Sequence, residues 1–275
     1  MNEKKFKTEL SEKRFEFGKN WKKFLSKLNN ERIKESEKSL LEKLKVENLR
    51  NKSFIDIGSG SGLFSLAAKN LGASVTSFDF DTDSVLCTKT LKSKFHNDDG
   101  NWKILQGSIL DKEFIKSLNI YDVVYSWGVL HHTGKMWVAI DNCLKLVNKE
   151  GVLFISIYND QGLKSHIWWT IKWIYNSLPN ILKKPFGYST GFFVIILMVI
   201  KYLLKFKPMV IVNDIIKQRR GMNLLNNIID WYGGFPYEFA DYNYLIDYIE
   251  NKGFKLENGV RSKSLGCHEL IFKKL

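Results

Sequence analysis

Two adjacent histidines, His131 and His132, are the first candidates for chemistry in this sequence. They come shortly after an apolar segment at residues 122–126. Histidine changes its protonation state near neutral pH, so either side chain could act as a general base towards a nucleophile. The alternative is that one of them starts a helix or forms a buried hydrogen bond. Asp160, which follows the apolar segment 152–158, is either a further base or a helix N-cap.

The segment at residues 58–62, Gly-Ser-Gly-Ser-Gly, is the strongest candidate for ligand binding. It follows an apolar strand that contains one acidic residue, Asp56. Glycines allow backbone conformations that a Cβ forbids and let a ligand approach the main chain. The spacing is one residue shorter than the usual dinucleotide fingerprint. A carboxylate here would repel a pyrophosphate but attract a cation. The segment therefore favours S-adenosylmethionine, whose methionine part carries an ammonium and a sulfonium.

Three further segments follow apolar strands and belong to the same predicted site. Asp79 lies about 20 positions after the glycine turn, where an acidic residue can accept hydrogen bonds from ribose hydroxyls. Phe80 would flank an adenine ring, and the alternative for it is core packing. The third and fourth strands run into Ser108 and Ser126. Because ligands bind at the carboxyl ends of parallel strands in open sheets, we expect these segments to lie together.

The elements that must position these residues alternate between strands and helices. Helices are expected at residues 63–71, 84–95, 136–147 and 242–251. Strands are expected at residues 54–57, 74–78, 102–106, 122–126, 152–158, 254–260 and 268–272. Strands separated by amphipathic helices indicate right-handed crossovers and a doubly wound, mostly parallel sheet.

The pattern divides the chain into four parts. Residues 1–52 form an N-terminal extension with two expected helices, and the motif Phe-Glu-Phe-Gly-Lys-Asn-Trp at 15–21 interrupts them. Residues 53–160 form the ligand-binding core, and residues 161–235 a helical insertion or lid. Residues 236–275 return to the core with one helix and the last two strands.

In these motifs the chain resembles the class I S-adenosylmethionine-dependent methyltransferases, closely over residues 53–158 and more loosely near the end. The resemblance implies an α/β fold with a seven-stranded Rossmann-like sheet, whose last strand is antiparallel. It also implies a role for each motif residue. Asp56 and the backbone of Gly58, Gly60 and Gly62 would hold the methionine end, Asp79 the ribose, Ser108 and Ile109 the adenine, while Ser126 and Trp127 would close over the methionine part.

The region after the fourth strand bears on the methyl acceptor. Residues 126–129 read Ser-Trp-Gly-Val, without the Asn/Asp-Pro-Pro-Tyr/Phe motif of most nucleic-acid amino-methyltransferases. Residues 128–133 look more like small-molecule methyltransferases, nearest to the ubiquinone-biosynthesis O-methyltransferases. That group has glutamates where this chain has Gly128 and His131, so we predict no metal site.

We therefore expect methyl transfer to an oxygen or sulfur of a small or lipid-like acceptor. The alternatives are an RNA or protein methyltransferase, or a non-catalytic cofactor-binding scaffold at the membrane. Nucleic acid is the less favoured partner because of the missing motif.

The charge balance and the insertion indicate a surface for an anionic partner. The formal net charge is +13, which favours nucleic acid or an acidic membrane unless the lysines merely solvate the surface. Between residues 165 and 212, aromatic residues alternate with lysines, a composition typical of interfacial helices. A lid over the active site and an oligomer interface are the alternatives. The lysines concerned are Lys164, Lys172, Lys183, Lys184, Lys201, Lys205 and Lys207.

The remaining features indicate a cytoplasmic protein that contacts the membrane peripherally if at all. The longest apolar run, 192–204, is shorter than the roughly 20 residues of a membrane-spanning helix. The N-terminus lacks the apolar core of a secretory signal. Cys87, Cys143 and Cys267 have the spacing of neither a disulfide framework nor a zinc site, and free thiols suit a reducing compartment.

Overall fold

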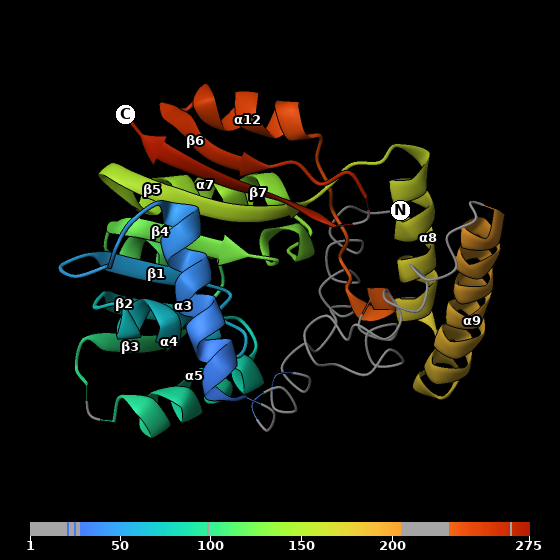
Figure 1. The fold of residues 1–275 in the computed structure, drawn as a ribbon, viewed down its shortest axis with the longest axis horizontal. Helices are drawn as coiled ribbons and strands as arrows, with labels where there is room; N and C mark the ends of the chain where they lie inside the picture. The colour runs from blue at the N-terminus through green and yellow to red at the C-terminus, as the bar shows by residue number, and fades with distance from the viewer. Residues whose placement is uncertain (1–20, 22–24, 26–27, 98, 205–230, 265) are drawn as a thin grey trace. The chain divides into compact units, whose positions relative to one another are not determined.

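The computed structural model describes two compact units of the chain (Figure 1). The residues described are 21, 25, 28–97, 99–204, 231–264 and 266–275. The larger part, here called the sheet unit, lies within Glu16–Ser165 and Glu238–Leu275. The smaller part, the insertion unit, lies within His166–Tyr237.

The sheet unit is built on a seven-stranded sheet with the strand order β3-β2-β1-β4-β5-β7-β6. The strands are β1 (Ser53–Ile57), β2 (Ser74–Asp79), β3 (Trp102–Gln106), β4 (Tyr121–Trp127), β5 (Val147–Tyr158), β6 (Phe254–Val260) and β7 (Cys267–Lys274). The pairs among β1 to β5 are parallel, and β7 runs antiparallel to both β5 and β6. The expected mostly parallel, seven-stranded sheet with an antiparallel last strand is confirmed.

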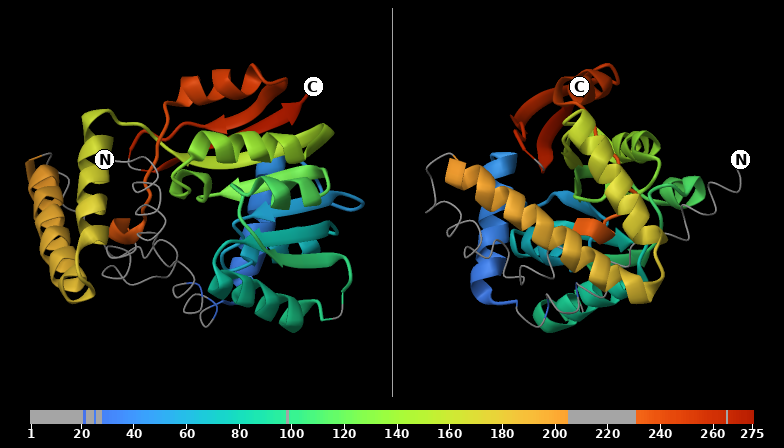
Figure 2. Two further views of the ribbon diagram at one scale, coloured as in Figure 1. Left: turned by 180° about the vertical axis from the view of Figure 1, so that it is seen from behind. Right: turned by 90° about the vertical axis from the view of Figure 1, so that its right-hand side faces the viewer.

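Helices cover both faces of this sheet (Figure 2). One face carries α3 (Asn30–Leu44), α4 (Leu63–Asn70) and α5 (Thr82–Phe95), and the other α6 (Lys112–Ser117), α7 (Met136–Leu146) and α12 (Tyr242–Glu250). Neighbouring strand residues alternate between the two cores: Phe54 packs with the first group, and Ile55 and Ile57 pack with the second. Both faces are therefore apolar, as a doubly wound sheet requires.

The strand order creates one switch point, between β1 and β4. From β1 the chain moves outwards through β2 to β3 and then crosses back to β4 on the other side of β1. Ligands bind at the carboxyl ends of strands at such a point. The turns that follow β1, β2 and β4 meet there.

Most element bounds agree with the sequence prediction within two residues, and the exceptions have local causes. The strand expected from residue 152 begins at Val147. Its first residues escaped prediction because they are mostly polar and because Glu150 has a left-handed backbone conformation (φ 59°). The short helix α6 and the 3-10 turn η1 (Leu130–His132) escaped prediction, since neither spans enough residues to show a period.

The N-terminal extension packs on the sheet unit through α3. Leu40 is fully buried there, in agreement with the expected second helix. The first expected helix lies mostly outside the described residues. Its described positions, Trp21 and Leu25, are helical, and Leu25 and Leu28 pack against the same core as α3.

The insertion unit contains α8 (Leu163–Ser177), most of which belongs to it, α9 (Asn180–Leu204) and the segment 231–237. Its core is aromatic. The rings of Tyr175 and Tyr232 stack with centroids 5.9 Å apart, and Trp168 meets the Trp231 ring edge-on at 5.7 Å. In the described part of the chain, no helix is both long enough and apolar enough to cross a membrane.

Lys172 of α8 is the unexpected residue of this core. Its side chain is fully buried, its ammonium donates to the Trp231 carbonyl oxygen, and it lies 4.1 Å and 4.9 Å from the ring centroids of Trp231 and Tyr237. Burial lowers its pKa to about 7. Lys172 was counted among the lysines of a surface for an anionic partner, and for this residue that is wrong, because aromatic side chains enclose it.

Candidate functional site

The glycine turn follows β1 and opens α4. Gly58, Gly60 and Gly62 have φ of 74°, 55° and 80°, in the left-handed region that favours glycine. The N–H groups of Gly58 and Ser59 donate to the Phe78 carbonyl of β2, at 2.8 and 3.1 Å. Gly62 at the N-cap of α4 has no side chain to cap the helix, and the Ser61 hydroxyl accepts from the Leu63 N–H at 3.4 Å. The Gly62 N–H donates to the Ser59 carbonyl at 2.8 Å, so hydrogen bonds within the chain fix the shape of the turn at the carboxyl end of β1.

Asp56 is buried beneath this turn. Its Oδ2 accepts a hydrogen bond of 2.5 Å from the Ser65 hydroxyl, which in turn accepts one of 2.7 Å from Ser77. Burial raises the pKa of Asp56 to about 7, and the charge of Asp79 raises it as well. This carboxyl group therefore changes charge near neutral pH, where a nearby cation would favour its ionised form.

Asp79 joins the end of β2 to the glycine turn. Its Oδ2 accepts from the Gly60 N–H and its Oδ1 from the Asp81 N–H, both at 2.9 Å. Phe80, the next residue, is 54% exposed beside this carboxylate. The structure thus brings together Asp79, Phe80 and the glycine turn, which the sequence analysis assigned to one ligand.

The turn after β4 lies directly against the glycine turn. A Cβ on Gly58 would lie 2.5 Å from both methyl carbons of Val129, so only glycine allows this approach. The Val129 carbonyl accepts the His132 N–H at 2.9 Å, which begins η1. The two histidines are therefore connected to the glycine turn through a single residue.

The imidazoles of His131 and His132 and the ring of Tyr158 form one cluster. The two imidazole centroids are 4.5 Å apart, and the Tyr158 ring lies 3.9 Å from that of His131 and 5.4 Å from that of His132. The Tyr158 backbone N–H donates to Nδ1 of His131 at 3.3 Å. Neutral His131 therefore carries its proton on Nε2.

Glu238 supports the histidine turn and was missed as a site residue. Its N–H donates to the His131 carbonyl at 2.9 Å, and both carboxylate oxygens lie 3.1 Å from the Met136 N–H at the start of α7. Burial raises its pKa to about 6. The signal available in the sequence was one acidic residue inside the apolar stretch 235–239.

The other predicted cofactor residues differ in what they can offer. The Ser126 hydroxyl is fully buried and donates to the Ile57 carbonyl at 3.1 Å. The Trp127 indole donates to Glu269 Oε1 at 3.1 Å. Ile109 is buried in the core, and Ser108 is half-buried with its hydroxyl accepting from the Leu110 N–H at 3.2 Å. Ser126 can therefore reach a ligand only through its backbone.

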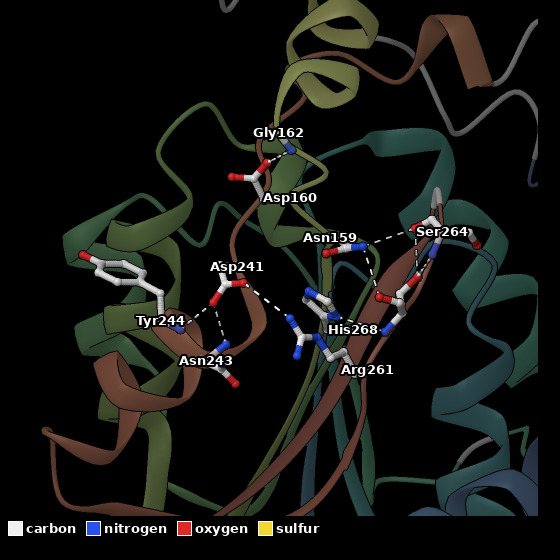
Figure 3. A network of polar contacts seen from close by, with 10 residues as sticks. Asn159, Asp160, Gly162, Asp241, Asn243, Tyr244, Arg261, Ser264 and His268 are labelled. Atoms are coloured by element: carbon white, nitrogen blue, oxygen red, sulfur yellow. Dashed lines mark hydrogen bonds and ion pairs between the residues drawn. The ribbon is translucent and has the colours of Figure 1, made fainter.

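Asp160 lies at the start of the insertion. The hydrogen bonds given above for the histidine turn do not involve its carboxylate. Its carboxylate accepts from the Gly162 N–H at 2.7 Å in the loop before α8, a turn contact that does not reach an N–H of the helix itself (Figure 3). Its own N–H donates to the Ala240 carbonyl at 3.0 Å. Among the described residues, no three His, Cys, Asp or Glu side chains gather as a metal centre would require.

A second polar network surrounds His268 (Figure 3). Its Nδ1 accepts from the Ser262 N–H at 3.1 Å, and its burial lowers its pKa. Asp241 accepts from Asn243 and Tyr244 at the start of α12 and lies 3.8 Å from Arg261. These contacts fix the hairpin between β6 and β7, which lies at the carboxyl ends of the parallel strands.

Comparison with known proteins establishes the family. A family model described as a methyltransferase domain matches residues 25–182. The chain thus belongs to the methyltransferase domain family, and its sheet order and motifs place it among the class I, S-adenosylmethionine-dependent enzymes. Its cofactor is S-adenosylmethionine.

Curated relatives cover part of the chain. It is 30% identical over 115 residues to a ubiquinone biosynthesis O-methyltransferase of Glaesserella parasuis, covering 42% of this chain and 49% of that protein. It is 27% identical over 160 residues to the protein of the same name from Pelagibacter ubique, covering 54% of this chain and 64% of that protein. A ribosomal protein L11 methyltransferase of Prochlorococcus marinus is 36% identical over 123 residues, covering 44% and 40%. The chain spans half to just under two thirds of the first two.

Solved structures agree on the fold. Magnesium protoporphyrin IX methyltransferase from Synechocystis, with bound S-adenosylhomocysteine, has a TM-score of 0.52 and 13% identity, covering 88% of this chain and 83% of that one. The same enzyme with S-adenosylmethionine has a TM-score of 0.52 and 10% identity, covering 88% and 79%.

We predict that Asp56→Asn removes a pH dependence of stability. Because the folded pKa is raised from 3.8 to about 7, the carboxyl group stabilises the fold fully below pH 4 and loses this contribution as the pH rises through 7. The free energy of unfolding of the native protein, minus that of Asp56→Asn, should fall by about 1.4 kcal/mol per pH unit over this range. Urea denaturation of the cofactor-free proteins between pH 4 and 8 measures it, and a constant difference would contradict the assignment.

Proposed function

We propose that this methyltransferase transfers a methyl group to an oxygen or sulfur of a small or lipid-like acceptor, which binds beside the histidine turn. The observation that carries the proposal is the contact of Val129 with Gly58, which holds His131 and His132 next to the glycine turn. S-adenosylmethionine supplies an activated methyl group on its sulfonium. The residues around it must position the acceptor and manage its proton.

The residues at the switch point fit this cofactor. The glycine backbone of 58–62 and the positive end of the α4 helix dipole suit the methionine carboxylate, and Asp56 suits its ammonium. Asp79 would accept from the ribose hydroxyls, with the exposed ring of Phe80 against the adenine. Ser108 and Ile109 would complete the adenine site, and Ser126 and Trp127 would border the methionine part.

The two histidines take different roles in the proposal. His131 has its Nδ1 occupied by the Tyr158 N–H, so its Nε2–H is suited to orienting the acceptor as a donor. His132 is then the general base that removes the acceptor proton. Glu238 holds the turn in place through the His131 carbonyl and the start of α7. Asp160 is the weaker candidate, because its carboxylate is engaged by the Gly162 N–H.

The relatives support an oxygen acceptor and leave one competing candidate. Two of them are named for O-methyl transfer in ubiquinone biosynthesis, at 27–30% identity. The ribosomal protein L11 methyltransferase, at 36% identity over 40% of its length, favours a protein acceptor. The small acceptor is preferred because the histidines at the turn after β4 provide a base, which a weakly acidic hydroxyl or thiol requires.

The lipid-like character of the acceptor rests on the insertion unit. Helix α9 exposes a row of large apolar residues spaced by four: Tyr188, Phe192, Ile196 and Ile200 are 42%, 66%, 37% and 47% exposed. Ile181 and Phe193 are 82% and 60% exposed. Rows of this kind beside lysines suit the headgroup region of an anionic membrane. A cytoplasmic enzyme that touches the membrane through this surface could collect an acceptor from it. In the alternatives, the same surface would cover the active site as a lid or pack against a second copy of the chain.

We predict that Asp79→Ala weakens S-adenosylhomocysteine binding by roughly 1.5–3 kcal/mol, the range for hydrogen bonds to charged groups. Isothermal titration calorimetry on both proteins measures this. Asp83→Ala, a half-buried acidic residue of the first turn of α5, is the matched control and should bind like the native protein. Equal affinities for native protein and Asp79→Ala would contradict the ribose assignment.

We predict that His132→Ala lowers turnover by about 10²–10⁴ with unchanged cofactor affinity, because a general base contributes that much. His131→Ala should mainly raise KM for the acceptor. Release of S-adenosylhomocysteine on incubation with phenolic and thiol acceptors, with and without an apolar tail, provides the assay. His132→Asn tests proton transfer separately, since it keeps a hydrogen bond without a basic site. Mild effects of all three variants in an active enzyme would reject the base assignment.

We predict that the protein cosediments with anionic vesicles and that added salt reduces binding, because charges are screened over about 8 Å at physiological ionic strength. Phe192→Ser with Phe193→Ser should reduce cosedimentation. Leu86→Ser with Ile120→Ser removes two exposed apolar residues of the sheet unit and should leave binding unchanged. No cosedimentation at low salt would reassign the surface to a lid or an oligomer contact.

A further inference from the structure

We propose that Trp21, from the N-terminal extension, forms one wall of the cofactor site and favours S-adenosylmethionine over its neutral product. The inference rests on the assignment of residues 58–62 to the methionine part of the cofactor. The motif at 15–21, which ends in this tryptophan, had no role in the sequence analysis beyond interrupting two helices.

The indole of Trp21 lies on the middle glycine of the turn. A Cβ on Gly60 would lie 2.9, 3.0 and 3.1 Å from Cε2, Nε1 and Cζ2 of the indole. Real Cβ atoms essentially never approach ring atoms so closely, so the contact requires glycine. The N–H of Gly60 donates a hydrogen bond to Oδ2 of Asp79. The indole therefore lies at the junction of the methionine and ribose positions.

The core of the sheet unit holds Trp21 in this place. Leu25, four residues further along the chain, packs with Leu28 against the core shared by α3 and α4. The Leu28 N–H donates to the Leu25 carbonyl at 3.2 Å, and Asn29 then caps α3 by accepting from the Arg32 N–H at 3.0 Å. The extension is thus anchored at Leu25 and Leu28.

An indole at this position discriminates by charge. Trp offers the best cation–π surface among side chains, and its ring N–H is a donor. The sulfonium is positive in the substrate cofactor and becomes an uncharged thioether after transfer. A wall formed by Trp21 therefore attracts the cofactor before transfer more strongly than the product after it, which aids product release.

The test compares the affinities of S-adenosylmethionine and S-adenosylhomocysteine by calorimetry for the native protein, Trp21→Phe and Trp21→Leu. Trp21→Leu should weaken S-adenosylmethionine by roughly two- to fivefold more than S-adenosylhomocysteine, the range of one partly exposed cation–π contact. Trp21→Phe should keep most of the preference. Trp173→Leu, a 41% exposed tryptophan of α8, is the control and should change neither affinity.

Fluorine NMR adds a readout that does not depend on affinity. With 5-fluorotryptophan incorporated, the Trp21 resonance is assigned as the one missing in Trp21→Phe, and it should shift on S-adenosylhomocysteine addition with the calorimetric Kd. An unmoved resonance under measured binding, or equal weakening of both ligands by Trp21→Leu, would overturn the role of Trp21 alone. Tighter binding by Trp21→Leu would overturn it too, by showing that the indole blocks the site. If the native protein binds neither ligand, the cofactor-site assignment itself fails.

Discussion

The close approach of Val129 to the Cα of Gly58 is the contact on which the rest of the site depends. It exists because β1 and β4 are neighbours at the switch point and because residue 58 has no side chain. Through it, the turn assigned to the cofactor and the turn that carries the histidines lie against each other. A larger residue at 58 would push the histidine turn away from the methionine position. The chemistry assigned to His132 needs that proximity, since proton removal and methyl transfer act on the same acceptor atom.

The electrostatics of the site contrast with those of the whole chain. The protein has a net charge of +13, yet the residues that line the proposed cofactor position include Asp56 and Asp79. Burial raises the pKa of Asp56 to about 7, and Glu238 behind the histidine turn has one raised to about 6. Carboxyl groups held near their titration point respond strongly to an arriving cation, which fits a ligand with a sulfonium and an ammonium.

Residues with a periodic or motif signal were predictable, and residues whose role depends on tertiary contacts were not. The strands, the glycine turn and Asp79 followed from alternation and spacing, since these patterns repeat the geometry of the backbone. From the sequence, Lys172 is expected at the surface, as most lysines are. The aromatic rings that enclose it come together only in the folded structure. Glu238 and Trp21 lie more than 35 residues from the turns that they contact, so no local pattern connects them.

A crystal structure with bound S-adenosylhomocysteine tests the central claim most directly, because it shows what lies beside the sulfur. The account predicts the methionine part on residues 58–62, ribose hydroxyls on the Asp79 carboxylate, and the His132 imidazole facing the space next to the sulfur. A ligand bound away from the glycine turn, or a sulfur whose surroundings contain neither histidine, would contradict it.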